Sequence, residues 1–213
     1  VRFIASDGAL ADTEIVAITV NDAGNQAPVL AAIGAQSVTE GANLNFGVIA
    51  TDPDADIPSL TAEDVPTNAT FTDNGDGTGT FDFNPDYTQS GTESVTFYAS
   101  DGVAVDSETI TITINEAGNQ DPTLDPIGNK SVLEGNTLAF TVTGSDPEGV
   151  APGLSTSALP NNASFLDNGD GTGDFQFSPD FTQAGFVDVT FYATDDSADG
   201  IRSMPATIFG ASR

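Results

Sequence analysis

The sequence predicts an all-β protein built from tandem β-sandwiches, and three observations lead to this prediction. Apolar residues occur in short alternating runs, Gly, Asn, Asp and Pro separate those runs, and the whole pattern returns after 94 residues. Alternation with a period of two is typical of strands that bury one face, and the separating residues are those of tight turns. A repeat of this length is large enough to enclose a hydrophobic core of its own.

The repeat divides the chain into three predicted segments. Residues 25–102 match residues 119–196 without a gap at 41 of 78 positions, and residues 1–24 match residues 95–118 at 13 of 24. We therefore predict a first full repeat at 25–118 and a second at 119–213. Residues 1–24 are then the hairpin formed by the last two strands, F and G, of an incomplete preceding repeat, and we expect the biological polypeptide to be longer.

Each full repeat contains seven segments that read as strands. In the first repeat, strands A to G are expected near 28–39, 43–51, 58–63, 69–72, 80–84, 94–100 and 108–115. The run TITITIN at 109–115 places only Ile on one face and only Thr on the other, as a half-buried strand requires. Seven strands in a unit of this length are typical of a Greek-key sandwich of the immunoglobulin-like type, here without the disulfide and Trp of antibody domains.

The composition excludes several classes of function. The chain has 32 Asp and Glu against 4 Lys and Arg, a formal net charge of −28, and no His or Cys. It therefore has no His-based triad, no thiol nucleophile and no zinc site of the usual ligands. The charge argues against nucleic acids and anionic membranes as partners. No apolar run approaches the roughly 18 residues of a membrane span, so no membrane insertion is expected.

The acidic residues gather where repeats join. Strand parity places the B–C and F–G loops at the end where the chain enters a repeat, here called the N-terminal pole. The A–B and E–F loops and the outgoing linker lie at the opposite end, the C-terminal pole. The predicted metal ligands of the second junction are Glu40, Asp86, Asn115, Glu116, Asn119, Asp146, Glu148 and Asp195. Those of the first junction are Asn21, Asp22, Asn25, Asp52, Asp54 and Asp101.

Carboxylates crowded in this way repel one another unless a cation lies between them. Ca²⁺ takes six to eight oxygen ligands at about 2.3–2.6 Å and accepts carboxylate, amide and backbone oxygens alike. Mg²⁺ requires a tighter octahedron and retains its water ligands, so it fits less well. The predicted cofactor is therefore Ca²⁺.

This arrangement of acidic residues resembles cadherins and the cadherin-like or immunoglobulin-like tandem repeats of long bacterial surface proteins. The resemblance lies in Glu40 and Glu134 after strand A, in the paired acids after strand B, in Asp101 and Asp195 after strand F, and in the linkers VNDAGNQAP (20–28) and INEAGNQDP (114–122). The linker is longer than in cadherins and the L-D-R-E motif is absent, with Asp86 as its one substitute. We therefore expect one or two ions per junction instead of three.

The resemblance implies a non-enzymatic, extracellular segment of a stalk or fibre at the cell surface, with Ca²⁺ stiffening the joints between neighbouring repeats. Two alternatives remain. The hairpin at 1–24 could complete another copy of the chain by strand addition and so build a filament. The sandwich could instead bind a carbohydrate through the outward-facing Tyr98 and Tyr192, and a cell-surface protein or glycan remains a candidate partner. The acid pairs lie in turns without an aromatic cleft, so no glycosidase is expected.

Three further motifs have simple structural interpretations. DNGDGTG (73–79 and 167–173) predicts a D–E hairpin turn and lacks the ligand order of an EF-hand. Tyr87 and Phe181 are expected to pack into the core at the E–F corner, as in the tyrosine corner of sandwiches. Asn68 and Asn162 fit the N-glycosylation acceptor pattern.

Overall fold

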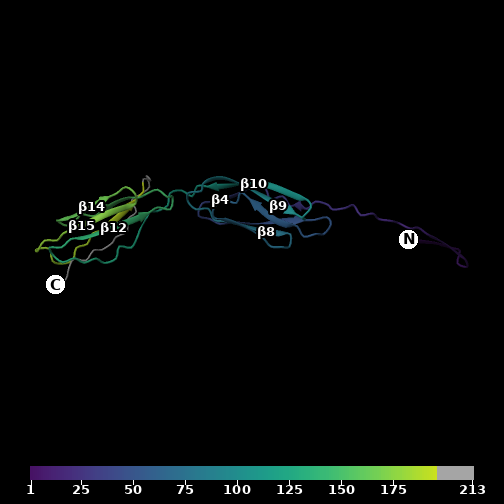
Figure 1. Ribbon diagram of the computed structural model, residues 1–213, viewed down its shortest axis with the longest axis horizontal. Coiled ribbons are helices and arrows are strands. Elements are labelled where there is room, and N and C mark those ends of the chain that lie inside the picture. Colours follow the sequence, from purple (N-terminus) through teal and green to yellow (C-terminus); the bar gives the residue numbers. More distant parts are fainter. Residues whose placement is uncertain (196–213) are drawn as a thin grey trace.

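The computed structural model describes residues 1–195, and every regular element in that range is a β-strand (Figure 1). The strands are β1 (Arg2–Ser6), β2 (Ala11–Ile15), β3 (Val29–Leu30), β4 (Gln36–Thr39), β5 (Leu44–Thr51), β6 (Ser59–Glu63), β7 (Ala69–Asp73), β8 (Thr78–Phe83), β9 (Gly91–Ser100), β10 (Val105–Asn115), β11 (Thr123–Leu124), β12 (Leu138–Ser145), β13 (Gly153–Thr156), β14 (Ala163–Asp167), β15 (Thr172–Phe177) and β16 (Phe191–Thr194).

The first repeat is a sandwich of two four-stranded sheets. One sheet has the order β4-β10-β9-β6 and the other the order β3-β5-β8-β7. All pairings are antiparallel except that of β4 with β10, which is parallel. The alternating burial of β8 and β10 directs one face of each strand between the sheets. The predicted all-β, immunoglobulin-like sandwich is confirmed.

Strand A differs from its prediction as one continuous strand over 28–39. It divides into β3, which pairs with β5, and β4, which pairs with β10, so the chain crosses from one sheet to the other. The crossing follows a left-handed turn at Gly34, whose φ is +70°. There the backbone N–H groups of Ile33 and Gly34 donate to the Glu108 carboxylate at 2.9 and 3.0 Å. Side-chain acceptors on β10 thus replace the sheet partners that the crossing segment lacks.

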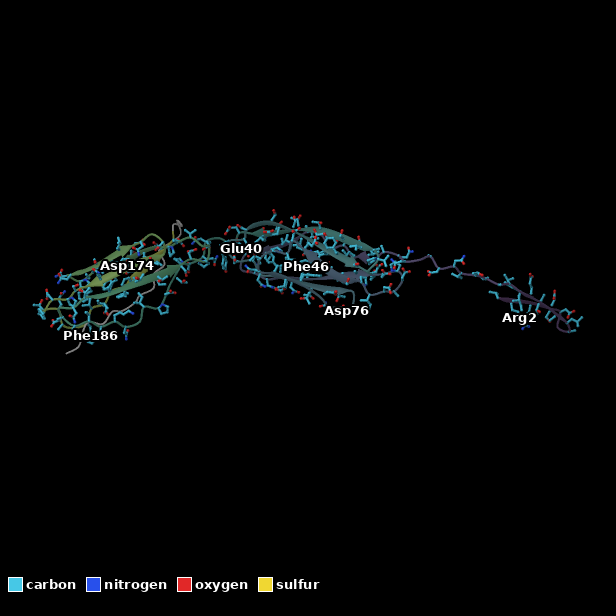
Figure 2. The ribbon with its side chains drawn as sticks, viewed as in Figure 1. Arg2, Glu40, Phe46, Asp76, Asp174 and Phe186 are labelled. Atoms are coloured by element: carbon cyan, nitrogen blue, oxygen red, sulfur yellow. The ribbon has the colours of Figure 1, made fainter. Side chains whose placement is uncertain are left out.

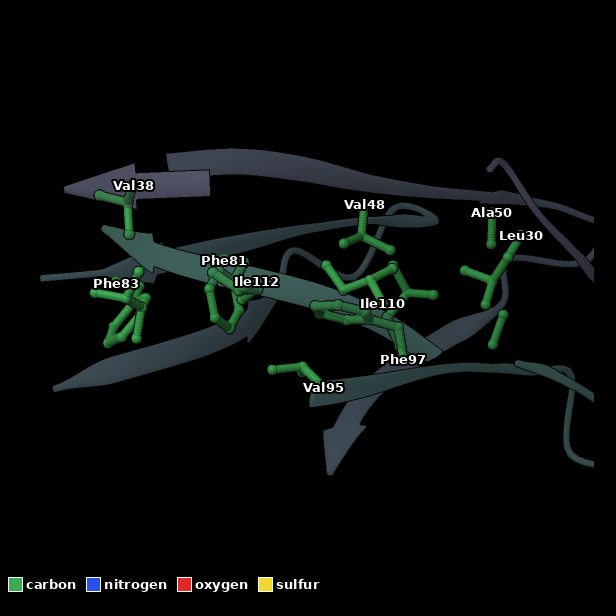
Figure 3. Packing of buried hydrophobic residues seen from close by; sticks show 13 residues of the cluster. Leu30, Val38, Val48, Ala50, Phe81, Phe83, Val95, Phe97, Ile110 and Ile112 are labelled. Atoms are coloured by element: carbon green, nitrogen blue, oxygen red, sulfur yellow. The ribbon is translucent and has the colours of Figure 1, made fainter. Parts of the chain in front are cut away.

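The core of the first repeat combines phenylalanine and aliphatic side chains between the two sheets (Figure 3). Phe97 is fully buried and its ring lies 5.2–6.0 Å from the rings of Phe46, Phe71 and Phe81. These contacts are mostly edge-to-face, the geometry that aromatic quadrupoles favour. A Cβ on Gly79 would collide with the Phe71 ring, so the glycine in β8 makes room for this packing.

The second repeat preserves most of this plan in its described part, although residues 130–133, the counterparts of β4, do not form a strand. β12, β14 and β15 have the bounds of β5, β7 and β8 moved by 94 residues, and they form the sheet β11-β12-β15-β14. β13 pairs with β16, and a separate cluster containing Phe175 and Phe191 fills the interior. The predicted last strand of this repeat lies beyond residue 195, outside the described residues.

The N-terminal hairpin β1–β2 has the register of the β9–β10 hairpin. Arg2 faces Ile15 as Thr96 faces Thr109, 94 residues later. Its apolar side chains are exposed, however: Phe3 is 59% exposed, whereas its counterpart Phe97 is fully buried. The local pairing therefore forms without the sandwich that covers it in the first repeat. Within residues 1–195, no helix is long and apolar enough to cross a membrane.

The aromatic core generates a stability prediction. We expect Phe97→Ala to lower the free energy of unfolding of the first repeat by about 3–5 kcal/mol, because it removes a buried ring and leaves a cavity among three others. Urea unfolding followed by circular dichroism should show one transition shifted and the transition of the second repeat unchanged. Val103→Ala, at an exposed position of the same repeat, is the control and should leave both transitions in place. Equal shifts of both transitions would contradict the separation of the two cores.

Candidate metal centre at the junctions

The second junction begins with a turn that presents two carboxylates. After β12, the Glu148 backbone N–H donates to Asp146 Oδ1 at 2.9 Å, and the Gly149 N–H donates to the Asp146 carbonyl at 3.0 Å. An aspartate that accepts from the backbone two residues on is a common way to close a short turn. Both carboxylates therefore lie in the short turn that follows β12.

The incoming linker binds to these acids through amide groups. The Gln120 backbone N–H donates to Glu148 Oε1 at 2.5 Å, and Asn119 Nδ2 donates to Asp195 Oδ2 at 2.6 Å. The Gln120 side chain donates to the Gly118 carbonyl at 2.8 Å and stabilises the linker conformation. Hydrogen bonds to ionised acceptors are among the stronger protein hydrogen bonds, so the linker is held against the second repeat.

The remaining oxygens of the acid pair have no donor. Asp146 Oδ2 and Glu148 Oε2 are both buried and lack a hydrogen-bond partner. The pKa of Glu148 is raised above its ordinary range, first because a proton on its carboxyl would be hydrogen-bonded to Asp146 and then because the carboxyl is desolvated. Two carboxylates this close favour a shared proton or a cation over two free charges.

The first junction repeats the arrangement 94 residues earlier. The Gln26 backbone N–H donates to Asp54 Oδ2 at 2.5 Å, and Asn25 Nδ2 donates to Asp101 Oδ2 at 2.9 Å. Asp52 Oδ1 accepts the Asp54 N–H at 2.7 Å, while its Oδ2 is buried without a partner. The pKa of Asp101 is lowered by the Ala104 N–H and by the Asn25 amide, which both stabilise the ionised form.

The C-terminal pole of the first repeat is different, because its acids already have donors. Glu40 is only 3% exposed, and its two oxygens accept the backbone N–H groups of Ser90 at 2.5 Å and Ala117 at 3.3 Å. In Figure 2, Glu40 lies at the end of the first sandwich nearest the second. The counterpart of Glu40, Glu134, has a buried Oε1 without a hydrogen-bond partner among the described residues.

Asp86 organises the E–F corner at the same pole. Its Oδ1 accepts the Thr88 hydroxyl and N–H at 2.7 and 3.0 Å, and its Oδ2 accepts Asn68 Nδ2 at 3.1 Å. The Thr88 hydroxyl is the main cause of the lowered pKa of Asp86. The corner approaches the next repeat: a Cβ added to Gly149 would lie 3.6 Å from Thr88 Cγ2.

The predicted ligands thus fall into three groups. The structure brings Asp146 together with Glu148, and Asn119 with Asp195. It likewise brings together their counterparts in the first junction, Asp52 with Asp54 and Asn25 with Asp101. Glu40 and Asp86 bind protein donors at the C-terminal pole, and Asn115 Nδ2 donates to the Val38 carbonyl at 3.2 Å. Asn21, Asp22 and Glu116 are exposed in the linkers. Within residues 1–195, no three acidic side chains converge into a ready-made metal cluster.

The role of the linker glutamines could not be predicted from the sequence. Gln26 and Gln120 each present a backbone N–H to the second acid of the pair and fold the side chain back onto a glycine carbonyl. The signal was the tripeptide GNQ, which occurs in both linkers. This tripeptide led to no prediction, because a residue's type does not show where its backbone N–H will donate.

The remaining motifs behave as local structure. Asp76 Oδ1 accepts the Thr78 hydroxyl and N–H at 2.6 and 3.1 Å, so DNGDGTG closes a hairpin. The Tyr98 hydroxyl donates to Glu63 at 2.9 Å, which is the main cause of its raised pKa. The prediction that Phe181 packs into the core was wrong: the ring is 80% exposed and lies over Gly135, outside the sandwich, whereas Tyr87 at the equivalent corner is half-buried.

The two glycosylation motifs share one hydrogen-bonding pattern. Asn68 Nδ2 donates to Asp86 and to Gln89, and Asn162 Nδ2 donates to Asp180 and to Gln183. Both side chains are exposed but engaged in the E–F corner. A glycan on either nitrogen would take the place of one of these donated hydrogens.

The acid pair predicts how stability depends on pH in the absence of divalent cations. A carboxyl whose pKa is raised on folding binds protons more tightly in the folded chain. The second repeat should therefore lose stability as the pH rises from 4.5, the ordinary value for Glu148, to its raised value. We expect Glu148→Gln in EDTA at neutral pH to raise the melting temperature of this repeat by roughly 2–4 °C, equivalent to about 0.5 kcal/mol. Asp188→Asn, an exposed acid of the same repeat, is the control; an equal rise in that variant would assign the effect to net charge.

A family model matches the first repeat, and several solved structures align with the chain at low identity. Residues 25–114 match the model of a family described as the bacterial Ig domain. No protein of curated function matches the chain. Among solved structures, all of the chain aligns with 34% of endo-fucoidan hydrolase MfFcnA4 from glycoside hydrolase family 107, at 18% identity and a TM-score of 0.46. The chain therefore spans about a third of the length of that hydrolase.

Two tandem immunoglobulin modules align over their whole length. The Ig1-2 module of the Drosophila receptor protein tyrosine phosphatase DLAR covers 88% of the chain at 16% identity and a TM-score of 0.37. The titin domains z1z2 in complex with telethonin cover 89% at 12% identity and a TM-score of 0.37. The two-sheet topology and the family match together lead to one conclusion. Residues 25–114 form an immunoglobulin-like sandwich that matches the bacterial Ig domain family.

Proposed function

We propose that the chain is a spacer segment of an extracellular bacterial surface protein, and that Ca²⁺ bound at the N-terminal pole of each repeat stiffens its joints. Bacterial immunoglobulin-like domains are common in extracellular surface proteins and are generally not catalytic. A structural or adhesive role is therefore the general conclusion. Calcium and the stiffened joint are the specific part of the proposal.

The unpaired carboxylate oxygens are the observation that carries the calcium proposal. Asp146 Oδ2 and Glu148 Oε2 are buried next to each other without a donor, and Asp52 Oδ2 is buried in the same way at the first junction. An uncompensated buried charge is strongly unfavourable, and native structures usually provide a partner for it. A divalent cation would supply that partner for both oxygens of the pair at once.

The donor set suits a hard cation. At the second junction, Asp146 and Glu148 offer carboxylate oxygens, and the Asn119 side chain offers an amide oxygen. Backbone carbonyls of the linker and water would complete the shell, because Ca²⁺ accepts all of these oxygens in a flexible geometry. Since no three acids converge among the described residues, we expect an affinity on the order of 10⁻⁴ to 10⁻³ M, as in extracellular modules.

The mechanical consequence follows from where these ligands lie in the chain. Asn119 belongs to the linker, whereas Asp146 and Glu148 belong to the body of the second repeat. An ion bound by both groups would fasten the linker to that repeat more firmly than two hydrogen bonds do. It would also neutralise part of the charge that makes neighbouring acidic repeats repel each other.

Calcium binding predicts a change in stiffness that scattering can measure. We expect the wild-type chain to show a narrower distribution of shapes in millimolar Ca²⁺ than in EDTA, with a change in maximum dimension by small-angle X-ray scattering. Native mass spectrometry should count bound Ca²⁺ at each junction. At a Ca²⁺ concentration about ten times the Kd, the second repeat should gain about 1.4 kcal/mol of stability.

The control separates site binding from charge screening. The double variant Asp146→Asn and Glu148→Gln should lose one ion and the stabilisation of the second repeat. Glu93→Gln, an exposed acid of the first repeat, should retain both. Identical scattering profiles in Ca²⁺ and EDTA, or equal stabilisation by Na⁺ at matched ionic strength, would contradict the proposal that Ca²⁺ stiffens the joint.

A second candidate function is self-assembly, favoured by the exposed apolar face of the β1–β2 hairpin. Val1 and Phe3 are exposed, whereas their counterparts Val95 and Phe97 are buried between the sheets of the first repeat. Strand addition to another copy would bury this face. Sedimentation equilibrium should then show mass rising with concentration, and Phe3→Ser should abolish the rise. A wild-type monomer at every concentration would contradict this candidate.

A further inference from the structure

Among the described residues, Glu40 is the only charged side chain that is buried, at 3% exposure. Burying a carboxylate is unfavourable by several kcal/mol unless hydrogen bonds or opposite charges compensate it. Glu40 directly follows β4, at the point where the outgoing linker leaves β10. What compensates its charge therefore determines how the linker departs.

Backbone N–H groups from two separate segments provide the compensation. Oε1 accepts the N–H of Ser90, which directly precedes β9, and Oε2 accepts the N–H of Ala117 in the linker. The Glu40 N–H in turn donates to the Asn115 carbonyl at 3.0 Å, and Asn115 Nδ2 donates to the Val38 carbonyl. The linker as far as Ala117 is thus bound to the body of the first repeat.

This arrangement has no need of a cation. Both Glu40 oxygens have donors, whereas at the N-terminal poles Asp52, Asp146 and Glu148 each retain a buried oxygen without one. We propose that Glu40 is a calcium-independent clamp that positions the outgoing linker on the first repeat. On this proposal the joint has two different halves, one held by hydrogen bonds alone and one open to a cation.

The two halves leave one residue between them. Ala117 is bound by Glu40, and Asn119 and Gln120 are bound by the second repeat, so only Gly118 has no such attachment through its own N–H or side chain. Its φ is +79°, a conformation that favours glycine, and a Cβ placed there would meet no atom within 4 Å. Bending of the joint is therefore concentrated in the torsions around Gly118.

The clamp can be tested in EDTA, where the proposed calcium site makes no contribution. The chain has no Cys, so Thr72→Cys and Leu166→Cys, at exposed positions of the two repeats, allow a spin label on each. We expect Glu40→Gln to broaden the interspin distance distribution at least twofold and to speed hydrogen exchange of the Ala117 amide about tenfold. Glu93→Gln, which removes the same charge from an exposed position, should change neither.

Two results would overturn the clamp. An unchanged distance distribution in a folded Glu40→Gln chain would show that Glu40 does not position the joint. If that variant does not fold, the wild-type Ala117 amide decides the matter. The clamp requires equal protection of this amide in EDTA and in Ca²⁺, so protection that appears only with Ca²⁺ would refute it. If the wild-type chain binds no Ca²⁺, the proposed calcium site is refuted but the clamp is not.

Discussion

Hydrogen bonds from linker amides to carboxylates are the interaction on which the architecture of the junction depends. A linker of this composition would otherwise be a solvated loop, because it has few apolar atoms to bury. Glu40 on one side and Glu148 on the other each accept a backbone N–H of the same linker, so it is bound from both ends. Such bonds are stronger than those between neutral groups and depend on donors that every residue except proline supplies. An acidic repeat protein can therefore order its joints with almost no basic residues.

The use of carboxylates as acceptors also explains why the two poles that meet at the second junction differ in their unpaired oxygens. A carboxylate has more acceptor capacity than a few N–H groups can fill, and any oxygen left over in a buried position needs a partner. Glu40 has a donor for each oxygen, and the Asp86 oxygens do as well. Asp146 and Glu148 each have one oxygen without a donor, and these face a like charge. The proposed division of the joint into a permanent half and a cation-dependent half follows from this difference in donors alone.

Much of the fold could be predicted because a strand with one buried face has alternating apolar and polar residues. The Ile–Thr alternation of β10 and the Phe pattern of β8 both indicate a buried face. Because the sequence repeats, each pattern can be compared with a second copy. Strand A was predicted as one piece because its change of sheet depends on acceptors from Glu108, 75 residues away. The exposure of Phe181 could not be predicted for a similar reason. An aromatic side chain favours burial, but whether the E–F corner buries it depends on the surrounding loops.

The sequence by itself determined the all-β class, the strand plan of the first repeat apart from the division of strand A, and the concentration of acids at the repeat ends. These are properties of spacing and residue type, which local periodicity and turn chemistry express. Only the tertiary structure decided which carboxylates are already satisfied and which are not. That outcome depends on where backbone N–H groups such as those of Ser90 and Gln120 point. Every residue but proline carries the same N–H, so its direction exists only once the chain has folded.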